Sequence, residues 1–80
     1  DVVDTYAQVL LNSGKAAKAL VKAEEAYKLS KGKSVDISLN FVETLLVNND
    51  IEQAKKILSK ITTKTKAQET KYKQLSAKII

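Results

Sequence analysis

Two short stretches contain a glycine followed by a lysine, the combination found in loops that hold phosphate groups. Such a loop also needs a glycine five residues before this pair and Ser or Thr after it, so that bare backbone N–H groups surround the phosphates. Val9 and Ala16 occupy those places around Gly14-Lys15. The stretch Gly32-Lys33-Ser34 has the hydroxyl, but Tyr27 stands in place of its first glycine. We therefore interpret both stretches as turns between helices.

Two adjacent carboxylates and four aromatic side chains are also of types that take part in catalysis or base stacking. Neighbouring helical residues point about 100° apart, so Glu24 and Glu25 do not flank one reacting bond, and Lys28 lies within reach of both. We interpret this pair as part of a solvated helix face. The aromatic residues fall at helical packing positions, which favours core packing over a base-stacking platform. They are Tyr6, Tyr27, Phe41 and Tyr72.

The composition of the 80 residues removes most catalytic and metal chemistry. Cysteine and histidine are both absent, so the chain lacks thiolate and imidazole ligands and the commonest general base. We predict no enzymatic activity, no cofactor and no metal site. The net charge of +5 comes from lysine, since the chain has no arginine. Arginine is the preferred side chain for bidentate contacts with guanine and phosphate, so this bias disfavours nucleic-acid binding.

Sequence features also bear on the compartment. Polar residues interrupt every apolar run well before the roughly 20 residues that a membrane-spanning helix needs, so we expect no membrane span. The chain begins at Asp1 without Met or a leader, and we expect it to be a piece of a longer chain. The absence of cysteine fits the bacterial periplasm or cell envelope and equally fits the cytoplasm, so the compartment stays open.

The elements that must position any site are helices. Proline is absent, and long stretches consist of helix formers with apolar residues at helical spacing. Ser34 and Asp36 are candidate caps of the third helix, and Asp50 is a candidate cap of the fourth. The residues 62–66 fit a loop followed by an N-cap. The pattern predicts about five helices, over residues 1–13, 15–30, 35–48, 50–62 and 65–79.

The first helical hairpin is repeated later in the chain. The aligned pairs are Tyr6 with Phe41, Leu10 with Leu45, Gly14 with Asn49, and Ala19 with Ala54. Gly14 and Asn49 both tolerate the left-handed backbone conformation that ends a helix. A third copy begins near Tyr72 and Leu75. The sequence therefore predicts two helical hairpins and half of a third.

This unit resembles the tetratricopeptide repeat, a helix-turn-helix of roughly 34 residues that stacks into a superhelix. Its large, small and turn positions correspond to Val3, Tyr6, Ala7, Leu10, Gly14, Ala19, Ala23 and Ala26, and then to Ser38, Phe41, Val42, Leu45, Asn49, Ala54, Leu58 and Ile61. The sequence departs from the family pattern at Ala23, Ser38 and Ile61, and no proline ends either unit. The resemblance implies an all-α solenoid in one domain, with repeats over 1–34 and 35–64 and a capping half-repeat over 65–80.

In style the units are similar to the C-terminal repeats of long bacterial arrays, such as the repeat-containing lipoproteins of exosortase-linked exopolysaccharide systems. Arrays of this kind end in a helix whose outer face is polar, because the last unit has no neighbour to cover it. The stretch 71–80 has that character.

The resemblance also implies a concave surface lined by the first helix of each unit. The residues that it assigns there are Asp1, Asp4, Thr5, Gln8, Leu11 and Asn12, followed by Asp36, Leu39, Asn40, Glu43, Leu46 and Val47. These positions include four carboxylates and no lysine, whereas the lysines of the second helices lie on the convex side. Lys73 and Gln74 are expected to close the far end of the surface.

Some family members hold a partner's C-terminal carboxylate on this surface with Lys, Asn and Arg. Asn40 matches one of those positions, but Asp4 and Gln8 replace the Lys and Asn of the first unit. Arginine is absent from the chain. We therefore do not assign a carboxylate-binding site.

The function implied by the resemblance is a non-catalytic scaffold for protein–protein interaction. We predict that a neutral or basic peptide binds the concave surface, with apolar contacts from Leu11, Leu39, Leu46 and Val47 and orientation set by Asp4, Asn40 and Glu43. Two alternatives stay open: a structural spacer or cap in a longer array, and a weak binder of anionic polymers through the convex lysines. Exposed repeat ends near Val2, Val9 and Ala16 would permit self-association.

Overall fold

The computed structural model describes residues 9–79, and all regular secondary structure within that range is helical. Residues 9–12 are helical and precede a turn. Four helices follow: α2 (Ala16–Ser30), α3 (Val35–Val47), α4 (Ile51–Ser59) and α5 (Lys66–Ile79). The predicted all-α fold of helical hairpins is confirmed. The predicted helix over 1–13 lies mostly outside the described residues.

The helix bounds agree with the sequence prediction within one residue, except at the end of α4. That helix stops at Ser59, whereas the sequence pattern predicts helix up to residue 62. The chain beyond Lys60 contains the β-branched run Ile61-Thr62-Thr63. Such residues lose χ1 freedom in a helix, which favours the extended connection that leads to α5.

The two tight turns have the same hydrogen bonds at equivalent positions. Gly14 has φ 77°, and the Lys15 and Gly14 N–H groups donate to Leu10 and Leu11 carbonyls. In the second hairpin Asn49 has φ 62°, and the Asp50 and Asn49 N–H groups donate to Leu45 and Leu46 carbonyls in the same way. This paired pattern is the Schellman arrangement that satisfies the last carbonyls of a helix. Both stretches predicted as turns at Gly14 and Asn49 are therefore turns.

Side chains cap three of the helix starts. The Ser34 Oγ accepts from the Ile37 N–H at 3.3 Å, and the Asp50 Oδ1 accepts from the Gln53 N–H at 3.4 Å, as predicted. Asp36 was the wrong choice for a cap, because it lies in the first turn of α3 rather than before it. There its carboxylate suits the positive end of the helix dipole.

The start of α5 has a reciprocal capping box. The Thr65 Oγ1 accepts from the Gln68 N–H at 3.1 Å, and the Gln68 Oε1 accepts from the N–H groups of Thr65 and Lys64 at 3.2 and 2.8 Å. Ser/Thr followed three residues later by Glu/Gln is the sequence signature of this motif. The predicted loop and N-cap over residues 62–66 agree with this arrangement.

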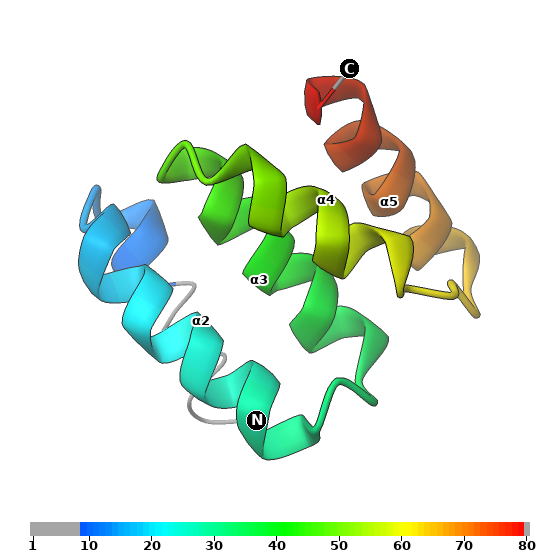
Figure 1. The fold of residues 1–80 in the computed structure, drawn as a ribbon, viewed down its shortest axis with the longest axis horizontal. Coiled ribbons are helices and arrows are strands. Elements are labelled where there is room, and N and C mark those ends of the chain that lie inside the picture. The colour runs from blue at the N-terminus through cyan, green and yellow to red at the C-terminus, as the bar shows by residue number, and fades with distance from the viewer. Residues whose placement is uncertain (1–8, 80) are drawn as a thin grey trace.

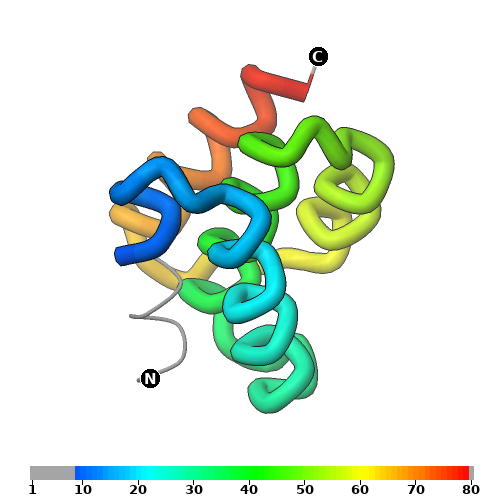
Figure 2. The backbone as a smooth tube through the Cα atoms, turned by 90° about the vertical axis from the view of Figure 1, so that its left-hand side faces the viewer, coloured from blue at the N-terminus to red at the C-terminus, as the bar shows by residue number. Residues whose placement is uncertain are grey.

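Helix α3 lies at the centre of the described structure and contacts α2, α4 and α5 (Figure 1). Its largest buried side chains are Leu39, Phe41, Val42, Thr44 and Leu45. The Phe41 ring packs against Tyr27 of α2 with ring centroids 4.9 Å apart. Figure 2 shows α2 and α5 on different sides of this central helix. The aromatic positions predicted as core are thus core for Phe41 and core-lining for Tyr27.

Buried alanines allow the helices to approach closely. Ala19, Ala23 and Ala26 of α2 and Ala54 of α4 expose 1% or less of their surface. A larger side chain at these places would have to displace a neighbouring helix, because protein interiors are close-packed. The positions at which the repeat pattern has small residues are therefore those where α2 and α4 contact neighbouring helices.

An amide side chain links the first hairpin to the second. The Asn48 Nδ2 donates to the Thr44 carbonyl of its own helix at 2.9 Å and to the Ala16 carbonyl at 3.0 Å. Ala16 begins α2 and Asn48 follows the last residue of α3, so the bond holds the two antiparallel helices in register at this end. Nothing in the repeat pattern indicates this contact.

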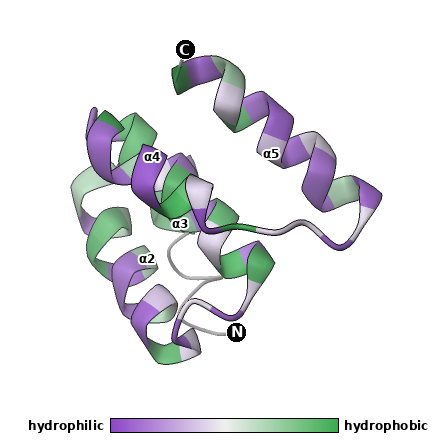
Figure 3. Ribbon diagram, turned by 45° about the vertical axis from the view of Figure 1, so that its right-hand side comes forward, coloured by the Kyte–Doolittle hydropathy of each residue, from purple (hydrophilic) through white to green (hydrophobic). Residues whose placement is uncertain are grey.

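The last helix, α5, is mostly hydrophilic (Figure 3). Leu75 is its buried side chain, and Tyr72 and Ile79 are partly buried against the core. The remaining residues of the helix are exposed or half-buried. This narrow apolar stripe with a broad polar face is the amphipathic pattern of a surface helix.

The close approach of α2 to its neighbours leads to a stability prediction. Ala19→Leu should overpack this contact and lower the free energy of unfolding by about 1–3 kcal/mol, measured by urea denaturation. Ala17→Leu is the matched control, since Ala17 is exposed on the same helix. Its effect should stay within about 0.5 kcal/mol, and equal effects of the two changes would contradict the packing argument.

The left-handed turn at Asn49 leads to a second prediction. Asn49→Gly should keep the unfolding midpoint or raise it, because glycine adopts positive φ without steric cost. Asn49→Ala should lower the free energy of unfolding by roughly 1 kcal/mol, because Ala in this conformation is strained. A thermal melt of both variants measures the difference. Equal melting temperatures would show that the turn does not impose this backbone conformation.

Candidate functional site

A groove runs between α3 and α5, which lie side by side and point in the same direction. The first contact joins Asp36 near the start of α3 to Gln68 near the start of α5, with the Gln68 Nε2 donating to the Asp36 Oδ1 at 3.1 Å. The next joins Lys71 of α5 to Asn40 and Glu43 of α3. Contacts that lie further along α3 also lie further along α5, as expected for parallel helices. We call this surface the α3–α5 groove.

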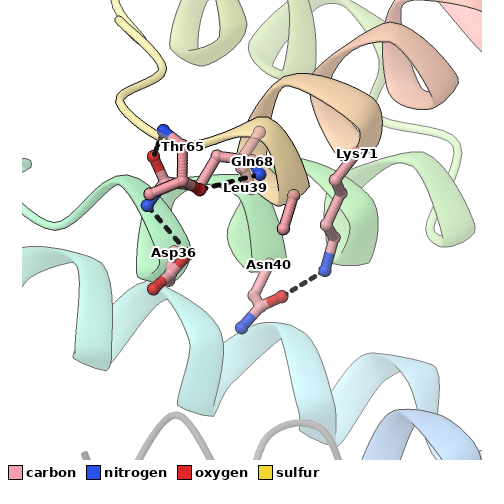
Figure 4. Close-up of a pocket in the computed structure, with 7 residues that line it drawn as sticks. Asp36, Leu39, Asn40, Thr65, Gln68 and Lys71 are labelled. Carbon is pink, nitrogen blue, oxygen red and sulfur yellow. Dashed lines mark hydrogen bonds between the residues drawn. The ribbon is translucent and has the colours of Figure 1, made fainter.

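The first hollow of the groove lies at the starts of both helices and has a volume of about 400 Å³ (Figure 4). Its lining residues are Asp36, Leu39, Asn40, Thr65, Ala67, Gln68 and Lys71. Leu39 was predicted as an apolar contact for a ligand, and the structure corrects this. Its side chain is 1% exposed and belongs to the core, so it forms the floor of the hollow and offers almost no surface.

The second hollow lies toward the ends of the same helices and has a volume of about 280 Å³. Its lining residues are Glu43, Leu46, Val47, Asn49, Ile51, Leu75 and Lys78. Val47 is 52% exposed, and Val9, Val21 and Leu29 are the other large aliphatic residues of the described range that are more than half exposed. Leu46 and Ile51 are half-buried, and Leu75 is buried. This hollow therefore combines an apolar floor and wall with a carboxylate and an ammonium.

An ion pair separates the two hollows. The Lys71 Nζ lies 3.5 Å from the Glu43 Oε1, and Lys71 also donates to the Asn40 Oδ1. The side chains of Lys71 and Glu43 are 32% and 31% exposed. Partial burial reduces the screening by water and salt that weakens fully exposed pairs. The contact therefore fixes α5 against α3 at the middle of the groove.

The charge of the groove differs from the sequence prediction. The concave positions of α3 contribute Asp36 and Glu43, as predicted, but α5 contributes Lys71 and Lys78. The described part of the surface is thus balanced in charge rather than acidic. The prediction considered the first helices of the two complete units and did not include the lysines that α5 adds to the same surface.

The remaining predicted residues have different locations. Asp4 and Gln8 lie outside the described residues. Leu11 is half-buried and Asn12 is exposed, and neither lines the two hollows. Five of the predicted site residues do come together along the groove, namely Leu39, Asn40, Glu43, Leu46 and Val47.

The far end of the groove is formed by other residues than predicted. Lys73 and Gln74 are exposed, and the Lys73 Nζ pairs with the Glu69 Oε1 of its own helix at 3.1 Å. Besides Ala67, the α5 residues that do line the groove are Gln68, Lys71, Leu75 and Lys78. Their spacing of three or four residues marks one face of a helix. That spacing was the signal in the sequence that could have identified them.

The convex lysines are interleaved with carboxylates. On α2 the Lys28 Nζ lies 3.1 Å from the Glu24 Oε1, and the Lys22 Nζ lies 3.4 Å from the Glu25 Oε2. The interpretation of Glu24 and Glu25 as a solvated, lysine-paired face is confirmed. Glu52 and Lys56 of α4 line one hollow together with Lys60, which follows that helix. The mixed charge weakens the field that an anionic polymer would meet on this side.

The second glycine-lysine stretch, which was considered as a phosphate-binding loop, forms a turn. Gly32 has φ 73° and packs against the Tyr27 ring in the turn after α2, where no strand precedes it.

Within residues 9–79, no three acidic side chains gather as metal ligands. Across the same range, no helix has the length and apolar character to cross a bilayer.

Comparison with known proteins gives one match. The family model described as tetratricopeptide repeat matches residues 10–79, which is nearly the whole chain. No curated protein and no solved structure matches the chain. The match covers the first hairpin from Leu10 onward, the second hairpin and α5, including every residue that lines the groove.

The capping box at the start of α5 leads to a prediction about the groove. Gln68→Ala removes the side-chain acceptor of the Thr65 and Lys64 N–H groups and the bond to Asp36, but keeps the backbone bond to Thr65 Oγ1. It should lower the free energy of unfolding by about 1 kcal/mol. Hydrogen exchange of the α5 amides should quicken more than exchange of the α3 amides. Gln74→Ala is the control, because Gln74 is exposed on the same helix. Equal exchange rates in the two variants would contradict the role assigned to Gln68.

Proposed function

We propose that this chain, which belongs to the tetratricopeptide repeat family, binds a peptide segment of a protein partner along the α3–α5 groove. Repeats of this family generally mediate protein–protein interaction and generally act as non-catalytic scaffolds. The finer proposal concerns which surface is used and what it binds. The observation that carries it is the exposed aliphatic side chain of Val47 beside a hollow with polar groups on both walls.

The apolar part of the groove supports a peptide rather than a small molecule as ligand. Leu46, Val47 and Ile51 provide partly exposed aliphatic surface in the second hollow. The first hollow continues the groove beyond the Lys71–Glu43 pair. Both hollows are open rather than enclosed, as expected for a surface that takes an extended segment. A compact ligand is usually buried in a cleft on most of its surface.

The polar part of the groove sets the expected charge of the peptide. Glu43 and Asp36 attract cations, and the Asn40 amide oxygen accepts hydrogen bonds. Lys71 and Lys78 oppose a strongly basic ligand by placing positive charge on the same surface. The peptide that fits this balance is apolar with few charges, and neutral or weakly basic overall.

Two alternatives belong to other functional classes. A spacer or cap in a longer repeat array would use the helices for stacking alone, and the polar face of α5 favours that alternative. An anionic-polymer binder would use the convex lysines, whose alternation with Glu24, Glu25 and Glu52 disfavours it. The peptide-binding proposal differs from both in requiring Glu43 and Val47.

Three finer predictions remain untested. The division into units over 1–34, 35–64 and 65–80, and the similarity to exosortase-linked lipoprotein arrays, remain predictions. The third prediction is self-association through the ends of the repeats, which the 54% exposure of Val9 favours. Ala16 is half-buried, and Val2 lies outside the described residues. Sedimentation over a range of concentrations tests self-association, which a monomer throughout that range would contradict.

Glu43→Gln tests the proposed use of the groove. A capped peptide of leucine and alanine with one central lysine should bind the wild type and shift the amide resonances of Glu43, Leu46 and Val47. The variant should bind it about three- to tenfold more weakly, because the lysine ammonium then meets a neutral amide in place of a carboxylate. Titration at constant ionic strength by NMR or calorimetry measures the affinity.

Glu52→Gln is the matched control for this experiment. It removes the same charge from an exposed position on α4, outside the groove. It should leave peptide affinity unchanged. An anionic oligosaccharide that shifts the resonances of Lys55 and Lys56, with steep salt dependence, would favour the polymer alternative. Absence of binding by both ligands would favour the spacer.

A further inference from the structure

The Lys71 ammonium is held in the middle of the groove by two acceptors from another helix. The Nζ lies 3.5 Å from the Glu43 Oε1, and it donates to the Asn40 Oδ1. Both acceptors belong to α3, whereas Lys71 belongs to α5. Figure 4 shows the Lys71 side chain reaching from its own helix down to Asn40. One carboxylate and one amide oxygen are suitable partners for an ammonium group, which has three hydrogen-bond donors and no acceptor.

The other ion pairs of the described residues differ from this one. Lys22, Lys28 and Lys73 each pair with a glutamate three or four positions away on the same helix. Their side chains are more exposed than that of Lys71. Pairs of that kind support a single helix and contribute little to tertiary structure. The Lys71–Glu43 pair instead joins two different helices, and one hollow of the groove lies on each side of it.

We propose that Lys71 is an internal occupant of an ammonium-binding position formed by Asn40 and Glu43, and that a lysine of the partner peptide binds there by displacing it. This inference rests on the proposed function of the groove. A peptide lying along the groove has to pass over Lys71, because the two hollows flank it. A lysine on that peptide would then meet the same two acceptors.

Competition of this kind has a predictable direction. The tethered ammonium is always near its acceptors, so it competes at a high effective concentration. Only molecules in which the position is open can bind the peptide lysine there. The apparent affinity of a lysine-bearing peptide is therefore its intrinsic affinity multiplied by the fraction of open molecules. The flexible four-carbon stem of Lys71 allows it to leave for solvent without movement of the backbone. Removal of the internal ammonium should therefore strengthen lysine-peptide binding.

Lys71→Met is the variant that tests the inference, because it keeps an unbranched stem and removes the charge. Lys73→Met is the matched control, since Lys73 makes its pair within α5 and lies outside the groove. The probes are the capped lysine peptide and its analogue with norleucine in place of lysine. Lys71→Met should bind the lysine peptide about three- to tenfold more tightly than wild type. It should bind the norleucine peptide with little change, and Lys73→Met should match wild type for both.

Each outcome of the titration has a separate meaning. Equal affinity of wild type and Lys71→Met for the lysine peptide overturns the inference and leaves the proposed function in place. An equal gain for both peptides also overturns it, because the variant has then only opened the groove. Failure of every form to bind either peptide overturns the proposed function together with the inference.

A second variant guards against a change in folding. Lys71→Arg keeps a cation at the position, so it should remain close to wild type in affinity for both peptides.

The side chains of Asn40 and Lys71 provide a direct readout in the protein without substitutions. The lysine peptide should shift the Asn40 side-chain amide resonance and the Lys71 side-chain resonances together, whereas the norleucine peptide should leave the Lys71 signals unchanged. Unchanged Lys71 signals at saturation with the lysine peptide would contradict displacement.

Discussion

The structure depends on the burial of one helix, α3, against the other helices that the structure describes. Its side chains Leu39, Phe41, Val42 and Leu45 are almost completely buried, and α2, α4 and α5 all contact it. A small domain has little apolar surface to bury, so a single helix that is covered from several sides contributes a large share of the hydrophobic stabilisation. Close packing around α3 requires short side chains on the helices that contact it. Ala23 of α2 and Ala54 of α4, which belong to the same buried cluster as the α3 side chains, meet that need.

The repeat pattern predicted this arrangement because its determinants are local. Gly14 and Asn49 specify left-handed turns through their own backbone preferences, and both end helices with the same pair of hydrogen bonds. Ser34 and Asp50 cap the next helices through their own side chains, each of which accepts from the N–H three residues later. The exception is the end of α4, where the β-branched run after Lys60 outweighed a favourable apolar pattern. Asp36 was misassigned because a cap and a first-turn carboxylate differ by only two positions.

The groove was predictable only on the side of α3. The family resemblance assigned Asn40, Glu43, Leu46 and Val47 to one surface, along which the two hollows lie, but it did not show that Leu39 would be covered. The contribution of α5 depends on how that helix is rotated about its axis relative to α3. Successive residues of a helix point about 100° apart, so Lys71 and Lys73 point about 200° apart, and only Lys71 faces the groove. Packing of Leu75, Tyr72 and Ile79 decides that rotation, and those contacts are non-local.

The charge of the groove follows from the amphipathic design of α5. Its apolar stripe is narrow, so the residues that border the stripe have to be polar enough to face water and long enough to reach α3. Gln68, Lys71 and Lys78 meet both conditions, since their aliphatic stems cover apolar surface while their polar ends reach acceptors or solvent. The same border residues therefore solvate the helix and set the chemistry of the surface beside it. A groove assembled in this way is balanced in charge even though the chain carries an excess of lysine, because α3 brings Asp36 and Glu43 to the surface that receives Lys71 and Lys78.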